Sequence, residues 1–232
     1  MKRRIVLTLG ALLFLSGAII FSYPHVQRFL YDRHSQIMIS DFQSRVEIYQ
    51  NESEDGTLGW LNELMVEYNE RLYEDRQKNL TDPFSYEQVS FSLREFGFEE
   101  EMIGYIHIPR IGEKLPIFLG ASQENMSRGA AHMTQTSLPV GGNNTNTVIA
   151  AHRGYLRARM FQNIHKLELG DEIFIVNFHQ TLRYRVVEIK IILPSEIDEV
   201  LIQSGRDLVT LISCHPLRQN SQRYLVFAER VK

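Results

Sequence analysis

The stretch Leu208-Val209-Thr210-Leu211-Ile212-Ser213-Cys214 is a short apolar run, rich in branched residues, that ends at the only cysteine of the chain. Residues of this kind favour a β-strand that is buried on both faces. A thiol at the end of a buried strand is held rigidly and can still open to a cleft. The segment therefore predicts a β-rich core with a chemically useful group at its edge.

Two other strand-like segments carry polar residues at their ends. His152 follows the apolar run 148–151, and Arg223 precedes Tyr224-Leu225-Val226. A cysteine nucleophile needs a proton-transfer partner, and acyl transfer needs positive charge where the oxyanion develops. Cys214, His152 and Arg223 are therefore the candidate catalytic residues.

Short strands dominate the sequence after Gly104. Expected strands lie at 105–108, 115–119, 147–150, 173–178, 182–193, 208–213 and 224–227, and short helices are expected after Ser122, at 156–164 and after the N-cap residue Ser195. Many short strands at close spacing predict a mainly β fold, either a barrel or a sandwich, with small helical additions.

The region before these strands has a helical pattern. Apolar residues recur every three or four positions from His25 to about Leu80, with a polar, glycine-containing break at 51–59 and a second helix from Trp60. Asp82-Pro83-Phe84 ends this region, because proline cannot continue a helix. The stretch 81–101 then reads as a long connection.

The first residues of the chain predict a membrane anchor. Lys2, Arg3 and Arg4 precede the uncharged stretch 5–23, which as a helix would span about 28 Å, close to the hydrocarbon thickness of a bilayer. The positive-inside rule keeps the basic residues in the cytoplasm and the rest of the chain outside. The alternative is a cleaved signal peptide, whose apolar core is usually shorter. No second apolar run follows, so a single N-terminal span is expected.

Composition excludes several classes of protein. The 232 residues are 44% hydrophobic and 23% charged with a net charge of −3, so no basic excess points to a nucleic-acid partner. A single cysteine excludes an intramolecular disulfide and a cysteine-based zinc site. The histidines at 107, 132, 165 and 179 show no metal-ligand spacing, so neither a metal nor a cofactor is expected.

Several segments resemble a known family. The stretch 210–214 with Arg223 resembles the sortase signature TLxTC…R, and residues 220–225 look like its NxxR continuation. Ala151-His152-Arg153-Gly154 resembles the HRG of pilus-building, class C sortases. Residues 136–142 and 104–109 also look like segments of that class, so the resemblance extends from about Gly104 to Arg230.

The resemblance also gives a meaning to Asp82-Pro83-Phe84. Class C sortases carry an N-terminal lid with an Asp-Pro-aromatic motif, and this triplet is similar. If the lid is present, Asp82 should face Arg223 and Phe84 should cover Cys214. The alternative is an ordinary helix stop followed by a turn.

Some positions depart from the family pattern. Ser213 stands where threonine is usual, and His215 follows the cysteine where a small polar residue such as threonine is expected. His215 could perturb the thiol or act as a rival base to His152. Other arginines could also line the groove, namely Arg153, Arg157, Arg159 and Arg218, although only Arg223 matches the family position.

The sequence patterns predict a cytoplasmic tip and transmembrane anchor at 1–24 and a helical region at 25–80. The resemblance adds a candidate lid and connection at 81–101 and a closed sortase-type barrel of about eight strands at 102–232. It implies a cysteine transpeptidase on the outer face of the cell membrane of a Gram-positive bacterium. Such an enzyme cleaves an LPxTG-like sorting motif, forms a thioester on Cys214 and passes the acyl group to a lysine amine of a pilin.

Three other functions remain as rivals. A housekeeping sortase would anchor surface proteins with LPxTG-like signals to peptidoglycan. A papain-like or caspase-like protease is disfavoured, because the sequence lacks QACxG and such chemistry needs no arginine at a strand start. A non-enzymatic membrane-tethered scaffold would keep working after substitution of Cys214.

Overall fold

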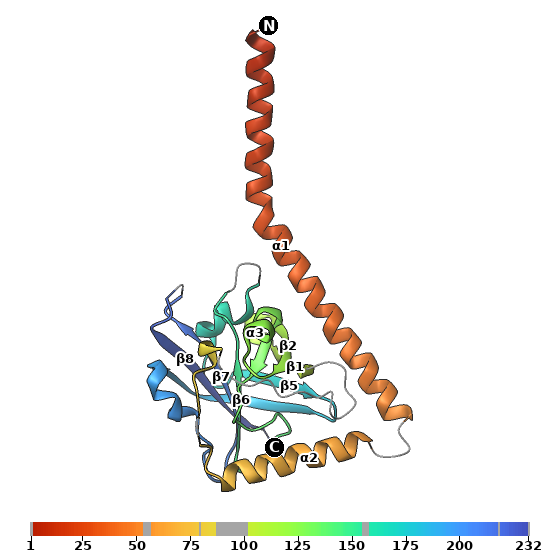
Figure 1. Cartoon of the computed structure of the whole chain (residues 1–232), viewed down its shortest axis with the longest axis vertical. Helices are drawn as coiled ribbons and strands as arrows, with labels where there is room; N and C mark the ends of the chain where they lie inside the picture. The colour runs from red at the N-terminus through yellow and green to blue at the C-terminus, as the bar shows by residue number, and fades with distance from the viewer. Residues whose placement is uncertain are drawn as a thin grey trace.

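The protein is described here by a computed structural model that covers residues 2–52, 57–78, 80–86, 102–154, 158–217 and 219–231. A β-barrel forms one end of the molecule, and a long N-terminal helix projects away from it (Figure 1). Residues 87–101 of the connection expected at 81–101 lie outside the described residues, as do Arg157 and Arg218.

The barrel contains eight strands: β1 (Met102–Ile108), β2 (Glu113–Leu119), β3 (Ala130–His132), β4 (Thr145–Ala150), β5 (Glu172–Asn177), β6 (Thr181–Ile192), β7 (Asp207–His215) and β8 (Gln222–Arg230). Their order is β1-β2-β3-β4-β7-β8-β6-β5, and pairing of β1 with β5 closes the barrel. The expected closed barrel is therefore confirmed. Sequence reasoning missed β3, which is too short to show an alternating pattern.

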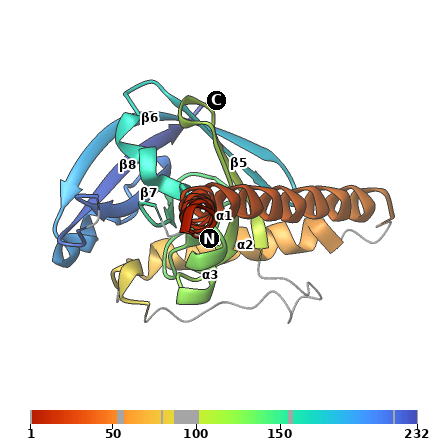
Figure 2. The same ribbon diagram turned by 90° about the horizontal axis from the view of Figure 1, so that it is seen from above.

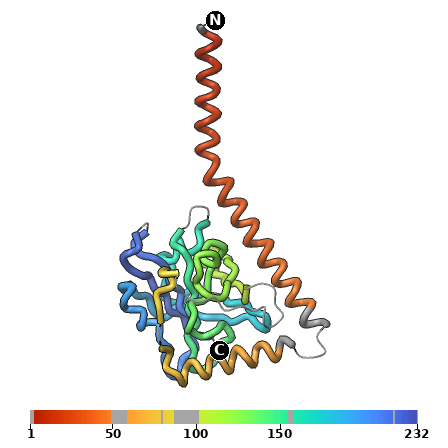
Figure 3. The backbone as a smooth tube through the Cα atoms, viewed as in Figure 1, coloured from red at the N-terminus to blue at the C-terminus, as the bar shows by residue number. Residues whose placement is uncertain are grey.

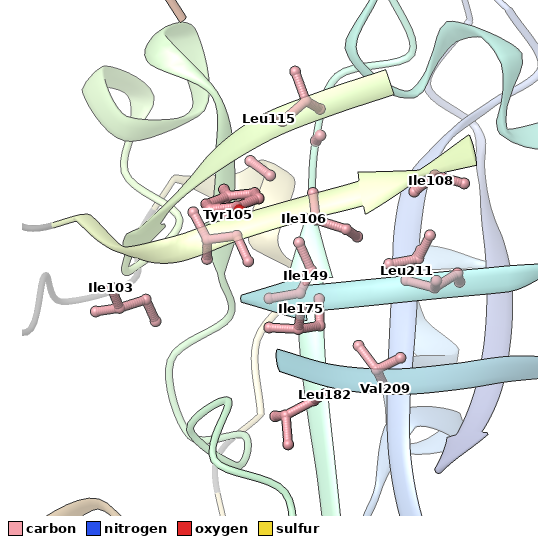
Figure 4. Close-up of a cluster of buried hydrophobic side chains, with 14 of the residues drawn as sticks. Ile103, Tyr105, Ile106, Ile108, Leu115, Ile149, Ile175, Leu182, Val209 and Leu211 are labelled. Carbon is pink, nitrogen blue, oxygen red and sulfur yellow. The ribbon is translucent and has the colours of Figure 1, made fainter. Parts of the chain in front are cut away.

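The inside of the barrel is filled by branched side chains from all around the wall (Figure 4). Ile149 of β4 and Val209 and Leu211 of β7 belong to this inner core. The residues between them do not, because side chains of a strand alternate between its two faces. The same alternation defines a second, outer face of the wall.

The outer face of β4, β7 and β8 is also apolar. Ala150, Ile212 and Leu225 are fully buried there, in a second cluster with the short helices that cover this side of the barrel. Strands buried on both faces read as continuous apolar runs, which is why the segment at 208–213 shows no alternation in sequence.

Two long helices precede the barrel. Helix α1 (Lys2–Glu52) and helix α2 (Thr57–Glu74) meet at an angle, and α2 crosses one end of the barrel (Figures 1 and 2). The apolar side chains Ile39, Phe42, Leu61 and Met65 of these helices are buried with the barrel core. The expected break near residues 51–59 is present, although α2 begins at Thr57 rather than at Trp60.

The first part of α1 lies apart from the rest of the molecule (Figure 3). Its most apolar window has a mean hydropathy of 2.4 and none of it is buried, so by length and composition it could cross a membrane, as could a signal sequence. The helix runs without interruption through Pro24, and Figure 1 shows a bend in it, as proline causes in a helix. The predicted boundary at residue 24 therefore falls within one helix and stays a prediction.

The short helices agree in part with the sequence. Helix α3 (Gln123–Arg128) begins after Ser122, whose side chain accepts a hydrogen bond from the Asn125 amide, as expected. The helix expected after Ser195 is instead the 3-10 helix η5 (Pro194–Val200), with Leu193 at its N-cap. Ser195 was the wrong cap, because Pro194 is preorganised for the first helical position.

Candidate active site

Cys214 and Arg223 face each other across two antiparallel strands. They are register partners near the end of β7 and the start of β8. Directly opposed residues in an antiparallel pair place their side chains on the same face of the sheet, with Cβ atoms about 4.5–5.5 Å apart. The thiol and the guanidinium therefore share one face of the barrel wall.

His152 reaches the same place from β4. This strand runs parallel to β7 with Ala150 opposite Ile212, so His152 and Cys214 each follow the paired residues by two positions. The two chains stay side by side beyond the ladder, because the Ala151 amide donates to the Ile212 carbonyl at 3.2 Å and the Ser213 hydroxyl donates to the Ala151 carbonyl at 2.8 Å. The hydroxyl of Ser213, at the position where threonine is usual in the family, thus bonds the end of β7 to the end of β4.

Side-chain alternation sends all three residues to the outer face of the barrel. Cys214 continues the outward series of Ile212 and packs against the outer apolar cluster, and Arg223 continues the outward series of Leu225. The structure thus brings together the three residues that the sequence singled out, on the outside of the barrel wall rather than inside it.

Residues 82–86 lie against this face. Figure 1 shows the segment after α2, drawn in yellow, running along the barrel wall beside β7 and β8. Asp82 accepts two hydrogen bonds from Arg223, at 2.7 Å from Nε and at 2.6 Å from Nη2. The pair is nearly enclosed, with side-chain exposures of 4% for Arg223 and 15% for Asp82. Two parallel bonds between a guanidinium and a carboxylate make a strong and specific contact.

Phe84 completes the cover. Its side chain is only 7% exposed and lies in the same apolar cluster as Ile212 and Leu225, against which Cys214 packs. The Arg223 guanidinium lies 4.9 Å from the centre of the Phe84 ring, and the His152 ring lies 6.1 Å from it. Phe84 therefore lies against Arg223 and His152, and in the apolar cluster that Cys214 contacts.

Sequence reasoning missed Tyr86, whose ring centre lies 6.3 Å from that of His152. It follows the one-turn 3-10 helix η1 (Pro83–Ser85) and has a left-handed backbone with φ of 59°. No sequence pattern signals this position, because the contact joins residues 66 positions apart in the chain.

The enclosed site favours the uncharged forms of Cys214 and His152. Burial raises the pKa of Cys214 to about 11; Arg223 and Arg153 oppose this effect, and Asp82 adds to it. Burial also lowers the pKa of His152. Burial acting alone would lower the pKa of Arg223, but its hydrogen bonds to Asp82 raise it. With Asp82 and Phe84 in place, thiolate and imidazolium are both disfavoured.

The other arginines and His215 have separate places. Arg153 donates a hydrogen bond to Nδ1 of His215 and lies over the ring of Tyr224. Arg153 and His215 therefore contact each other close to the end of β7. Arg159 instead lines a hollow beside α1 with Glu113, which corrects the expectation that it could line the groove. Among the described residues, no group of three His, Cys, Asp or Glu side chains could hold a metal ion.

Comparison with known proteins identifies the family. Residues 106–231, more than half of the chain, match the model of the sortase domain. The chain belongs to the sortase family. Among curated proteins, Sortase A of Bacillus anthracis is 29% identical over 133 residues, which are 57% of this chain and 61% of that protein. Sortase D of Bacillus subtilis is 24% identical over 131 residues, or 55% of this chain and 63% of that protein. The matches thus span less than two thirds of these curated sortases.

Solved sortase structures match a larger part of the chain than the curated proteins do. Sortase C1 of pilus island 1 of group B Streptococcus has a TM-score of 0.76 and 34% identity, with 85% of this chain and 92% of that chain covered. Sortase C of Streptococcus pneumoniae has a TM-score of 0.74 and 33% identity, with 84% and 96% covered. The expectation of a sortase that is similar to class C enzymes is confirmed.

Proposed function

We propose that this sortase is a pilus-assembling cysteine transpeptidase. The observation that carries the proposal is the convergence of Cys214, Arg223 and His152 at adjacent strand ends on one face of the barrel. These residue types supply a nucleophile, a proton donor and acceptor, and a cation for the oxyanion. The similarity to structures of sortase C from pilus systems supports pilins as the substrates.

The proposed reaction has two acyl-transfer steps. The Cys214 thiolate attacks the threonine carbonyl of an LPxTG-like motif, and Arg223 stabilises the oxyanion of the tetrahedral intermediate. His152, protonated, donates a proton to the leaving glycine amine, and a thioester remains on Cys214. A lysine amine of the next pilin then attacks the thioester. His152 takes the amine's proton, Cys214 leaves as thiolate, and an isopeptide bond joins the two pilins.

The proposal includes a lid formed by Asp82, Pro83 and Phe84. Its support is the bidentate contact of Asp82 with Arg223 and the burial of Phe84 against the site. Unperturbed pKa values give a thiolate–imidazolium fraction on the order of a per cent at pH 7. The pKa of Cys214 near 11 reduces this fraction much further while the lid is in place. Opening would release two N–H groups of Arg223 for substrate and remove a negative charge from beside the thiol.

We also propose that the N-terminal half of α1 anchors the enzyme, with the barrel on the outer side of the membrane. The support is the exposed apolar segment of α1 and the basic residues Lys2, Arg3 and Arg4 before it. An anchored barrel would meet pilins as they leave the membrane.

The test uses the full chain in detergent micelles with pilin subunits of the same cell. Intact-mass spectrometry would look for an adduct on Cys214 that hydroxylamine removes and for covalent pilin multimers. We expect both, and expect neither with Cys214→Ala. Multimers formed by the Cys214→Ala chain would overturn the enzymatic proposal in favour of a scaffold.

The second candidate is a sortase that anchors surface proteins to peptidoglycan. The curated relatives keep this candidate open, since those from Bacillus anthracis and Listeria monocytogenes are named Sortase A. In the same experiment, an adduct that transfers to a peptidoglycan-precursor amine but not to a pilin lysine would favour anchoring. Transfer to a pilin lysine would favour pilus assembly.

A further inference from the structure

A second set of side chains, Arg153, His215 and Tyr224, lies directly behind the candidate catalytic residues. Each is the next residue in the chain after one of them. Each of three neighbouring strand ends therefore supplies one residue to the catalytic set and the following residue to the second set. Successive strand residues point to opposite faces. Accordingly Tyr224 packs against the inner core, whereas Cys214 packs against the outer cluster.

We propose that Arg153, positioned by His215 and Tyr224, is a second cation that stabilises the Cys214 thiolate, in addition to Arg223. The proposal rests on the proposed function only in taking Cys214 as the nucleophile. Arg153 acts on the thiol through its charge, and His215 is a positioning residue that acts through Arg153.

The contacts hold Arg153 on two sides. Its Nη1 donates to Nδ1 of His215, and its guanidinium carbon lies 5.4 Å from the centre of the Tyr224 ring. The His215 ring in turn lies 5.7 Å from the Tyr224 ring. A guanidinium over an aromatic face is attracted by the electrons of the ring. The three side chains therefore support one another.

The arrangement is not explained by stability alone. Arg153 Nε is buried and has no hydrogen-bond partner among the residues that the structure describes. A buried unpaired N–H costs about 1–3 kcal/mol. A cation kept at this cost, in contact with the residue that follows Cys214, points to an electrostatic role in addition to packing.

The charge of Arg153 acts on Cys214 in the same direction as that of Arg223, and against burial and Asp82. The partners of the two arginines differ. Arg223 is bonded to Asp82 and, in the proposed reaction, to the substrate oxyanion. Arg153 has neither task, so its support of the thiolate persists when Asp82 leaves and Arg223 turns to substrate.

His215 can hold Arg153 only while its Nδ1 carries no proton. The groups that face it are Arg153 from the chain after β4, His165 of η4 (Met160–Lys166) and Tyr224 of β8. Burial, Arg153 and His165 all lower the pKa of His215. The hold is therefore complete at neutral pH and is lost as the pH falls through this lowered pKa, when imidazolium and guanidinium repel each other.

The test measures the rate at which iodoacetamide alkylates Cys214 as a function of pH, using the full chain in detergent without pilin. The thiolate displaces iodide, so the profile reports the thiol pKa whether or not the chain transfers pilins. We expect Arg153→Gln to slow alkylation at pH 8 about threefold to tenfold, which corresponds to a rise of about 0.5–1 in the thiol pKa. The same series in a Phe84→Ala background removes any dependence on the closed segment.

A double-mutant cycle separates the two roles. His215→Thr should slow alkylation in the unaltered chain and have no further effect in Arg153→Gln, because it acts through Arg153. Arg159→Gln is the matched control, since Arg159 lies in the hollow beside α1 and should leave the rate unchanged. If Arg153→Gln does not fold, Arg153→Met serves instead, because it also removes the charge, and it should slow alkylation by a similar factor.

Three results would overturn the proposal. One is a rate for folded Arg153→Gln within twofold of the unaltered chain. Another is an equal slowing by Arg159→Gln, which would make the effect one of overall charge. The last is full additivity of His215→Thr with Arg153→Gln, which would mean that His215 acts on the thiol without Arg153. In the first case, a lowered melting temperature would assign Arg153 a structural role only.

Discussion

The N-terminal part of the chain contacts the barrel in two regions that are held in different ways. Helices α1 and α2 bury Ile39, Phe42, Leu61 and Met65 in the barrel core. The segment 82–86 is held by the ion pair of Asp82 with Arg223 and by the rings of Phe84 and Tyr86. Apolar burial contributes about 25 cal/mol per Å², whereas a buried ion pair regains hydration when it separates. The comparison teaches that apolar burial fixes the helices to the barrel, whereas the segment over Cys214 depends largely on an ion pair, as the proposed lid requires.

Hydrogen bonds reinforce this difference. Asn69 of α2 both donates to the Leu138 carbonyl at 3.1 Å and accepts from the Leu138 amide at 2.7 Å, so a loop of the barrel is fastened to the helix. Gln43 of α1 donates to the Tyr105 hydroxyl at 2.8 Å. These contacts join neither Cys214 nor the segment 82–86 and carry no charge, so the proposed opening of that segment would not require them to break.

The largest effect, on transpeptidation, is expected for the thiol of the barrel that the segment 82–86 covers. Cys214→Ala removes the nucleophile, so transpeptidation should fall by about a thousandfold or more. Formation of pilin multimers, followed by gel electrophoresis, measures the loss. Circular dichroism should be unchanged, because the half-buried thiol is replaced by a smaller apolar group. Retained multimer formation would show that Cys214 is not the nucleophile.

The next effect concerns the packing of α1 on the barrel. Phe42→Ala removes a ring that packs against Tyr105 and Phe178, so the free energy of unfolding should fall by about 3–5 kcal/mol. Urea titration measures it. Phe29→Ala on the same helix is the control, since Phe29 is 63% exposed and its loss should change stability by less than about 0.5 kcal/mol. Equal effects of the two variants would contradict a firmly docked α1.

A smaller effect is expected where the segment 82–86 covers the site. Phe84→Ala should speed alkylation of Cys214 about tenfold to a hundredfold, which corresponds to about 1.4–2.7 kcal/mol of lost cover. The loss of stability should stay below that of Phe42→Ala, because a segment that detaches locally can lose no more than its own docking free energy. Phe84→Trp keeps an aromatic cover and should remain slow. No acceleration by Phe84→Ala would end the lid proposal.

The smallest effect isolates the charge of the lid. Asp82→Asn keeps the shape of the side chain but removes a negative charge that raises the pKa of Cys214. The rise of the alkylation rate with pH, centred near pH 11 in the closed enzyme, should move to lower pH, so the rate at pH 8 should increase about threefold to tenfold. Asp41→Asn is the control, because Asp41 pairs with Arg45 on the exposed side of α1. A shift to higher pH would contradict the sign of this coupling.

The chemistry of the site was accessible from sequence, but its side of the barrel was not. Cys214, His152 and Arg223 are recognisable because each polar residue adjoins an apolar strand. The strands themselves are apolar on both faces, so nothing in their pattern says whether the thiol points into the barrel or out of it. The parallel register of β4 and β7 also escapes a reading of the sequence, since pairing of distant strands leaves no local mark.

The sequence by itself determined the family, the strand-rich second half, the helical N-terminal region and the three candidate reactive residues, because these depend on local composition and motif spacing. The family resemblance also led to the expectation that Asp82 faces Arg223, as it does in the structure. Only the tertiary structure decided that Tyr86 approaches His152 and that Arg153 is held by His215. These contacts join residues from separate elements whose side chains alone are compatible with many partners. Closure of the barrel selects one set of neighbours, and the chemistry of the site follows from that selection.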